Sequence, residues 1–261
     1  MDRDSVVALY DRSMRLHPAP LPDGYRLEGW DGLVAMIGPS VTLHDNCVIY
    51  GQPDPAASDR AVEAAVERFA ALGCSFEWKR YDHDDPAGAL AASLRRRGFV
   101  PREPETFMAL DLDAADLVPP AGLDIRRLDA PAQLADVLAI QDAVWAEDHR
   151  GLIDAIAAEW RQAPDRLSRY LAYVDGRPAS TGWIRFHPGR LFADLWGGST
   201  LAAHRGRGLY RGLVAVRAGE ARRRGARYLT IDASPDSRPI LARLGFEALD
   251  RITPYLWHNR S

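Results

Sequence analysis

Lysine, cysteine and long apolar runs are scarce in this sequence of 261 residues. The one lysine, Lys79, lies between Trp78 and Arg80, so the Gly-Lys-Ser or Gly-Lys-Thr of a nucleotide-hydrolase phosphate loop is excluded. Two cysteines, Cys47 and Cys74, do not make a disulfide framework and are expected to be small core residues. No stretch approaches the roughly 18 apolar residues of a membrane span, and the first residues lack a signal-peptide pattern. A cytoplasmic protein with no membrane partner is therefore expected.

Charge is distributed unequally along the chain. Residues 1–120 carry 12 Lys+Arg and 20 Asp+Glu, a net −8, whereas residues 121–261 carry 21 Arg and 16 Asp+Glu, a net +5. An anionic ligand is therefore expected to bind the second half. Basic charge can also indicate nucleic acid, but here it surrounds one segment and has no zinc-finger or aromatic-interleaved pattern. We expect no nucleic-acid partner.

Residues 195–225 predict a strand, a glycine-rich turn and a long helix that ends at Gly225. The turn reads Arg205-Gly206-Arg207-Gly208-Leu209-Tyr210. Backbone N–H groups at the start of a helix have no partner within the helix and lie at its positive end, so they favour a phosphate or pyrophosphate. The dinucleotide pattern Gly-x-Gly-x-x-Gly is not fulfilled, because Arg211 takes the place of the third glycine. An ordinary strand-to-helix turn is the alternative.

The remaining elements form two similar series, which indicates a degenerate duplication. The first series is expected to contain strands at 33–37 and 47–50, a helix at 58–72, strand 74–81, a helix from Pro86 and strand 105–112. The second is expected to contain strand 123–128, helices at 131–144 and around 152–160, a hairpin at 170–186, strand 192–201, a helix and further strands. We therefore expect one domain at 1–112, a linker at 113–122 and a second domain at 123–261. In place of the glycine-rich turn, the first domain has the proline-containing segment 51–58 and is expected not to bind pyrophosphate.

A run of acidic residues with one histidine, Asp82-His83-Asp84-Asp85, has the composition of a metal site. The next residue is Pro86, which is typical of the first position of a helix, and an acidic residue before it is typical of a helix cap. We therefore expect Asp85 to cap a helix and no metal to be bound.

The glycine-rich turn resembles the Arg/Gln-x-x-Gly-x-Gly/Ala signature of the GNAT superfamily, the acyl-CoA-dependent N-acyltransferases, except that Tyr210 stands where Gly or Ala is usual. Residues 228–246 resemble that family's fifth strand, fourth helix and Leu-Gly-Phe end. The resemblance implies an α/β fold class (a mixed α+β sheet) with two GNAT-like domains. Each domain would have a mixed, largely antiparallel sheet flanked by helices, with a splayed central strand pair.

The resemblance also implies acetyl-CoA as the co-substrate. The pyrophosphate would lie on the N–H groups of the turn, the pantetheine arm would pair with the strand edge before it, and an N–H near Thr200 would polarise the thioester carbonyl. Two glycines, Gly197 and Gly198, indicate a β-bulge that opens this edge. The residues expected to bind acyl-CoA are Gly198, Ser199, Thr200, Leu201, Arg205, Gly206, Arg207, Gly208, Leu209 and Tyr210.

The implied reaction is direct attack of an amine on the thioester in a ternary complex, with a small-molecule or peptide amine as acceptor. Asp194 is the candidate base, although it could equally face solvent. The family's usual leaving-group acid, a tyrosine, corresponds to Leu241, so either Ser237 or Tyr210 would substitute or the thiolate would leave unprotonated. The expected acceptor-binding residues are Glu147, Asp148, His149 and Trp196, with a solvated loop as the alternative for the first three. Two other functions stay open: a CoA-binding regulatory module without turnover, and an unrelated phosphate-binding or nucleic-acid-binding protein.

Overall fold

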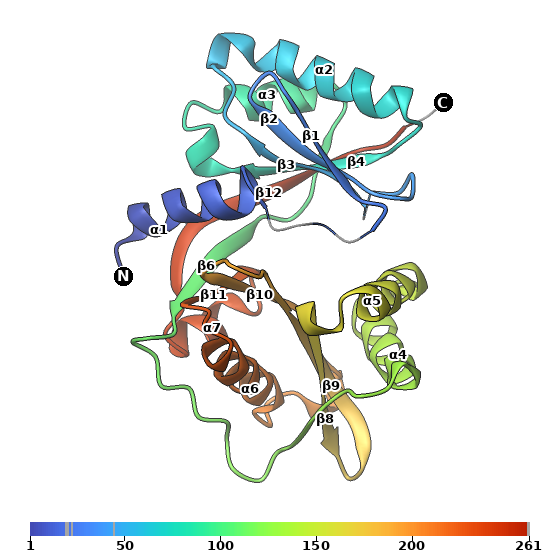
Figure 1. Cartoon of the computed structure of the whole chain (residues 1–261), viewed down its shortest axis with the longest axis vertical. Helices are drawn as coiled ribbons and strands as arrows, with labels where there is room; N and C mark the ends of the chain where they lie inside the picture. The colour runs from blue at the N-terminus through green and yellow to red at the C-terminus, as the bar shows by residue number, and fades with distance from the viewer. Residues whose placement is uncertain (19–20, 22, 44, 260–261) are drawn as a thin grey trace. The chain divides into compact units, whose positions relative to one another are not determined.

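The computed structural model describes residues 1–18, 21, 23–43 and 45–259, which divide into two compact units. Unit 1 comprises residues 1–108, 232–236 and those from 248 onward, and unit 2 comprises residues 109–231 and 237–247. Figure 1 shows the helices and strands of both. None of the helices in the described part of the chain is long and apolar enough to span a bilayer.

Unit 1 contains the strands β1, β2, β3, β4 and β12, paired in that order, with β5 beside β12. Its elements are α1 (Arg3–Tyr10) with a π-helical continuation (Asp11–Arg15), β1 (Arg26–Trp30), β2 (Leu33–Ile37), β3 (Asn46–Gly51), α2 (Ser58–Ala71), β4 (Phe76–Tyr81), α3 (Ala89–Arg96), β5 (Val100–Pro101) and most of β12 (Glu247–Trp257). The pair β3 and β4 is parallel, whereas β1–β2, β2–β3 and β4–β12 are antiparallel.

The core of unit 1 lies between this sheet and the helices α2 and α3. Phe69 of α2 stacks on Phe76 of β4 with ring centroids 4.0 Å apart, and Leu94 of α3 is fully buried in the same cluster. The sequence analysis missed β1. Its signal was present, because Asp31-Gly32 forms the hairpin turn with positive φ at both residues.

Unit 2 contains the strands β6, β11, β10, β9, β8 and β7 in that order. Its elements are the last residues of β6 (Glu105–Asp111), β7 (Asp124–Arg127), α4 (Leu134–Trp145), α5 (Arg150–Gln162), β8 (Leu167–Val174), β9 (Arg177–Phe186), β10 (Phe192–Thr200), α6 (Leu209–Arg223), β11 (Tyr228–Ala233) and α7 (Arg238–Arg243). In Figure 1, α6 lies on one side of β8–β10 and the pair α4 and α5 lies on the other. The expected fold class is confirmed, because each unit has a mixed sheet with helices packed on it.

The helix α6 begins and ends as its sequence predicts. Gly208 at its N-cap has φ +79°, and Leu213 and Ala221 are fully buried. At the other end Gly225 has φ +82°, and the Ala226 N–H bonds the Ala221 carbonyl at 3.0 Å. This αL ending needs a residue that tolerates positive φ, which explains the glycine.

The residues that flank the expected linker lie against α6 within unit 2. The Arg222 guanidinium donates a hydrogen bond of 2.9 Å to the Leu112 carbonyl. A Cβ added to Gly212 would lie 2.6 Å from a methyl carbon of Leu123 and 2.7 Å from one of Ile125. Because Gly212 has no side chain, Leu123 and Ile125 can pack closely against α6.

Each unit contains a strand whose residues lie, in the sequence, on the other side of the expected linker. In unit 1, β12 pairs antiparallel with β4 from Ile252 opposite Tyr81 to Trp257 opposite Phe76. In unit 2, the neighbour of β11 is β6, and just beyond β6 the Leu112 N–H bonds the Arg227 carbonyl at 2.8 Å. The units thus differ from the expected division near the C-terminus, and the domain boundaries at 112 and 123 remain a prediction.

Candidate functional site

The strands β10 and β11 of unit 2 are paired over three residues and then separate. Their parallel register joins Phe192 to Tyr228 and ends with Asp194 opposite Thr230. Beyond that point β10 continues to Thr200 and stays paired with β9 on its other edge. Along Trp196–Thr200, the second edge of β10 therefore offers backbone hydrogen-bonding groups to a ligand.

A β-bulge lies where the strands separate, as expected. The register between β10 and β9 shifts between Trp196 and Ser199, and Gly197 has φ +59°. A Cβ on Gly197 would lie 1.8 Å from the Trp183 ring, and one on Gly198 would lie 2.7 Å from the Tyr210 ring. Both glycines are therefore required by the packing on the two sides of the strand.

Side chains of α4 fix this bulge. Gln141 Nε2 donates to the Gly197 carbonyl at 2.9 Å, and Gln141 Oε1 accepts from Ser199 Oγ at 3.0 Å. Trp145 Nε1 donates to the same Ser199 oxygen at 3.0 Å. The Ser199 side chain is thus buried and fully engaged, so any contact with a ligand must come from neighbouring backbone.

Two alternate residues of the strand edge that is expected to bind pantetheine already form hydrogen bonds within the protein. The Ser199 carbonyl accepts from Ser180 Oγ at 2.8 Å, and the Leu201 N–H donates to the Ala179 carbonyl at 3.0 Å. Because backbone groups alternate in direction along a strand, those of Gly198 and Thr200 face the opposite edge. Gly198 and Thr200 are thus better placed to bind a ligand chain than Ser199 and Leu201.

The glycine-rich turn connects β10 to α6 through a short 3₁₀ helix (Ala202–His204). Gly206 and Gly208 have φ +75° and +79°, and Arg205 and Arg207 are exposed. The first α-helical bond joins the Gly212 N–H to the Gly208 carbonyl at 2.9 Å, so the N–H groups of residues 209–211 precede the helical ladder. These donors and two arginines form an anion-binding arrangement.

Solved structures share the architecture of the whole chain. A GCN5-related N-acetyltransferase from Kribbella flavida is 19% identical, with a TM-score of 0.69, over 97% of this chain and 93% of the other. A tandem GNAT protein from the clavulanic acid biosynthesis pathway is 17% identical, with a TM-score of 0.60, over 92% and 85%. A GCN5-related N-acetyltransferase from Sphaerobacter thermophilus is 14% identical, with a TM-score of 0.60, over 90% and 84%.

The chain has a tandem GNAT fold. At these identities the likeness concerns the fold alone. The sequence itself matches no protein-family model and no curated protein. The GNAT fold is the one that the glycine-rich turn and residues 228–246 resemble.

Two expected catalytic residues of this GNAT fold, Tyr210 and Ser237, are brought together. Ser237, at the N-cap of α7, is hydrogen-bonded to the Tyr210 hydroxyl. Burial raises the pKa of Tyr210, against smaller opposing effects of Arg217 and Ser237, so the phenol keeps its proton at neutral pH. Leu241, at the place of the family's usual tyrosine, is fully buried and packs in the core.

The expected base, Asp194, is bound to two neighbours. Its Oδ2 lies 2.6 Å from His187 Nε2, and its Oδ1 accepts from Thr230 Oγ1. Burial acts to raise the pKa of Asp194, but the charge of His187 and the bonds from His187 and Thr230 outweigh it and lower the pKa. An ionised Asp194 is a weak base that is well suited to orient the His187 ring.

The loop between α4 and α5 is fixed by local contacts. His149 Nδ1 lies 3.1 Å from Asp142 Oδ1, and Asp148 accepts from the Arg150 N–H at 3.0 Å and pairs with its guanidinium at 2.6 Å. Glu147 is exposed. Glu147 and Asp148 are thus both on the surface, but Asp148 is paired with Arg150 and His149 with Asp142.

Trp196, the fourth expected acceptor residue, is 39% exposed on β10. The Arg185 guanidinium lies 5.4 Å from its ring centroid and 2.9 Å from the Glu159 carboxylate of α5. Along β10, Trp196 and Asp194 are two residues apart and point to the same face. This face therefore carries an exposed aromatic ring, a carboxylate and a histidine close to the bulge.

The sequence analysis missed Gln141, His187 and Arg217. Arg217 is 1% exposed, and its Nε donates to the Leu213 carbonyl at 2.8 Å. One signal was available: Arg217 lies four residues from both Leu213 and Ala221 and so falls within the apolar stripe of α6. Gln141 and His187 lie outside any motif, so their partners could be found only in three dimensions.

The acidic run in unit 1 forms ion pairs instead of an open metal site. Asp11, His83 and Asp84 place one ligand atom each within 4.8 Å of one another. However, Arg15 donates to Asp11 Oδ1 at 2.6 Å and also pairs with Asp84, so a guanidinium already serves both carboxylates. Asp85 accepts from the Leu90 and Ala91 N–H groups at 3.0 and 2.9 Å. Asp85 thus accepts from N–H groups at the start of α3, as expected of a capping residue, but the predicted helix start was wrong: the N-cap position is Gly88 and α3 begins at Ala89 rather than at Pro86.

Proposed function

We propose that unit 2 transfers an acyl group, most simply acetyl, from acyl-CoA to an amine by direct attack in a ternary complex. The observation that supports this best is the separation of β10 from β11 after Asp194, next to the bulge and the glycine-rich turn. These features give one open strand edge and one anion-binding helix start, joined by a few residues of chain. An elongated ligand with a polyamide arm and a pyrophosphate requires this combination.

Binding would be divided between the turn and the strand. Gly206 and Gly208 would let the N–H groups of residues 207–210 approach the pyrophosphate, and Arg205 and Arg207 would add positive charge. The backbone of Gly198 and Thr200 would pair with the pantetheine amides. An N–H near Thr200 would then donate to the thioester oxygen, where negative charge develops in the transition state.

The reaction forms a C–N bond and breaks a C–S bond. The neutral amine nitrogen attacks the carbonyl carbon, and the amine must lose a proton as the tetrahedral intermediate collapses. We assign this proton to His187, oriented by Asp194, with Asp194 itself as the simpler alternative. The departing thiolate would take a proton from Tyr210, whose hydroxyl would be resupplied through Ser237.

The acceptor would bind on the face that carries Trp196. The exposed indole can contact an apolar or cationic part of an amine, and Glu147 supplies an exposed carboxylate on the loop between α4 and α5. A small-molecule or peptide amine remains the proposed acceptor class.

A panel of amines tests the proposal. Each amine is mixed with acetyl-CoA and the protein, and free thiol is followed with a chromogenic disulfide. Amine-dependent thiol release that disappears in Gly208→Val supports the proposal. Saturable CoA binding without thiol release on any amine would instead favour a regulatory CoA-binding module.

A further inference from the structure

A hollow in unit 1 is lined by arginines. Its volume is about 420 Å³, and its walls come from β4, α3, the segment around β5 and β12. The charged residues that line it are Arg80, Asp82, Arg95, Arg102 and Arg251. We call this hollow the arginine pocket. The charge of its lining is strongly positive, although residues 1–120 are acidic as a whole.

Three of these arginines have no carboxylate partner. Among the residues that the structure describes, Arg95, Arg102 and Arg251 form no ion pair. Most of the other arginines of unit 1 contact a carboxylate. The paired ones are Arg3, Arg15, Arg26, Arg68, Arg80, Arg96 and Arg97.

Arg80 forms the fixed part of the pocket. It is only 9% exposed, its Nε donates to Asp85 at 2.8 Å, and its Nη1 donates to Asp82 at 2.6 Å. Thr253, directly opposite Arg80 in the β4–β12 register, is 7% exposed and also lines the pocket. The base of the pocket is therefore a rigid sheet, with the unpaired arginines at its rim.

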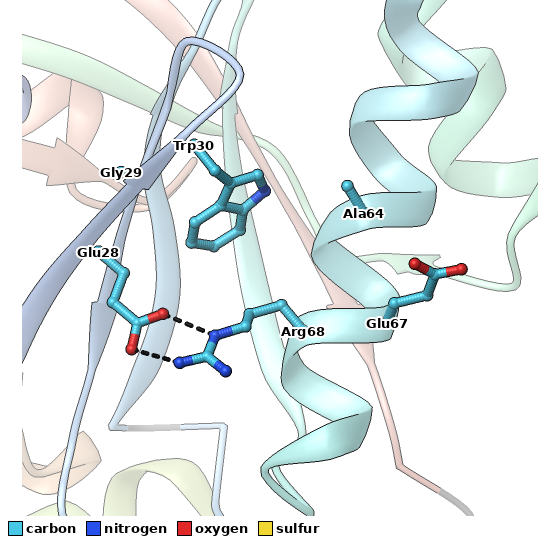
Figure 2. Close-up of a pocket in the computed structure, with 6 residues that line it drawn as sticks. All are labelled: Glu28, Gly29, Trp30, Ala64, Glu67 and Arg68. Carbon is cyan, nitrogen blue, oxygen red and sulfur yellow. Dashed lines mark hydrogen bonds and ion pairs between the residues drawn. The ribbon is translucent and has the colours of Figure 1, made fainter.

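A second hollow of unit 1 shows the opposite arrangement. Figure 2 shows Arg68 of α2 reaching across to Glu28 of β1 below the Trp30 ring. The two hydrogen bonds of this pair measure 2.6 and 2.7 Å, and they lower the pKa of Glu28 to about 2. The charge of Arg68 is thus already neutralised, whereas the arginine pocket has guanidinium groups available for a ligand.

We propose that the arginine pocket binds a small phosphorylated molecule. Guanidinium groups bind phosphate through paired N–H donors, and converging unpaired cations raise the local concentration of anions. The volume exceeds that of one phosphate and falls within the range of small-molecule sites. Pro101, Pro104 and Tyr255 provide an apolar wall for the body of the ligand. This inference is independent of acyl transfer, because all the residues belong to unit 1.

Calorimetric titration with phenyl phosphate and with inorganic pyrophosphate tests the inference. The full chain is used, with Arg205→Gln and Arg207→Gln in every sample so that the glycine-rich turn contributes little. The proposal predicts saturable binding of both anions, a weaker response to benzyl alcohol, and affinity that falls as salt is raised. It also predicts that Arg102→Gln and Arg251→Gln together weaken binding at least tenfold.

The matched control is Arg12→Gln with Arg60→Gln, two exposed arginines of unit 1 outside the lining. It should leave both affinities within twofold. Circular dichroism and the melting temperature identify any variant that fails to fold, in which case Arg102→Lys with Arg251→Lys replaces it, with weaker binding expected because the planar donor pair is lost. Absence of saturable binding, or equal affinities in the pocket and control variants, would overturn the inference.

Discussion

Arg217 Nη1 lies 2.9 Å from the carbonyl oxygen of Trp183, directly beneath the strand that supports the bulge. The same nitrogen lies 3.3 Å from the Trp196 carbonyl. Gly182 makes room for the guanidinium, because a Cβ there would lie 2.8 Å from Arg217 Nη1. Burial lowers the pKa of Arg217 to about 10, which still leaves it charged at neutral pH. A buried cation thus holds the two carbonyls that frame the bulge.

The variant Arg217→Lys should lose these bonds in part, because an ammonium cannot reproduce the spacing of the guanidinium donors. We expect a loss of about 1–3 kcal/mol in the free energy of unfolding, measured by urea titration. Arg177→Lys, at an exposed position of β9, is the control and should change stability by less than about 0.5 kcal/mol. Equal effects of the two changes would show that Arg217 does not support the bulge.

Replacing Gly208 by valine should weaken CoA binding by about 2 kcal/mol, because the N–H groups of the turn lose their geometry. Gly176→Val is a close match, since Gly176 has φ +74° and, like Gly208, no atom that would clash with a Cβ. Both variants should lose stability from the strained φ, but only Gly208→Val should lose affinity in a calorimetric titration. A folded Gly208→Val protein that binds CoA normally would place the pyrophosphate elsewhere.

Calorimetry should also find a single tight CoA site per chain. In unit 1 the corresponding turn contains Asp54, whose carboxylate accepts from the Ala56 N–H at 2.9 Å, so an acidic group already occupies the helix start that an anion would need. Two equivalent sites would contradict the assignment of CoA to unit 2 alone.

The variants Asp194→Asn and His187→Gln should lower kcat by similar factors, on the order of 100-fold each, if the two side chains act as one base. The double variant should then be little slower than either single one, because residues that act as a unit are not additive. The measurement is amine-dependent thiol release at saturating acetyl-CoA. A large effect of Asp194→Asn with none for His187→Gln would assign the base to Asp194 alone.

Stability should decrease at alkaline pH because of His83. Burial opposes its charge, but hydrogen bonds to Asp11 and Asp250 and the charge of Asp84 raise its pKa from 6.5 to about 9. The folded-state pKa is the higher one, so the stabilisation is complete below about pH 6.5 and disappears as pH rises through about 9. Its size is at most about 3 kcal/mol.

Urea unfolding of the wild type and of His83→Gln at several pH values checks this. The difference between the two should shrink from pH 6 to pH 10. His258→Gln, at an exposed position, should follow the wild type throughout. A constant difference for His83→Gln would show that the protonation of His83 is not coupled to folding.

The local signals in the sequence predicted much of the fold. Gly206, Gly208 and Gly225 mark the limits of α6 because each position requires positive φ, a property that the residue type reveals. Gly197 marked the bulge for the same reason, and Gly198 did so because the Tyr210 ring leaves no room for a Cβ. Alternating apolar residues located β8 and β9 around the Asp175-Gly176 turn.

The partners of polar side chains could not be predicted in this way. Gln141 and Ser199 are 58 positions apart, and Arg15 meets Asp84 across 69 positions. Neither contact follows from periodicity, because it depends on which faces the tertiary fold brings together. The sequence therefore indicated a cation, a carboxylate or an amide at each place, but not which group each one would bind.

The pairing of β12 with β4 has a consequence for biosynthesis. Residues 76–81 of β4 are translated long before their partners at 252–257. At about 5–20 residues per second, the ribosome needs roughly 10–35 s to cover the interval. Throughout that time one edge of β4 has exposed N–H and C=O groups, which is the condition under which strands pair with the wrong chain. The strand β4 therefore gains this partner only after the last strand has been translated. Nascent chains released before residue 252 should be recognised by chaperones that bind unpaired strands.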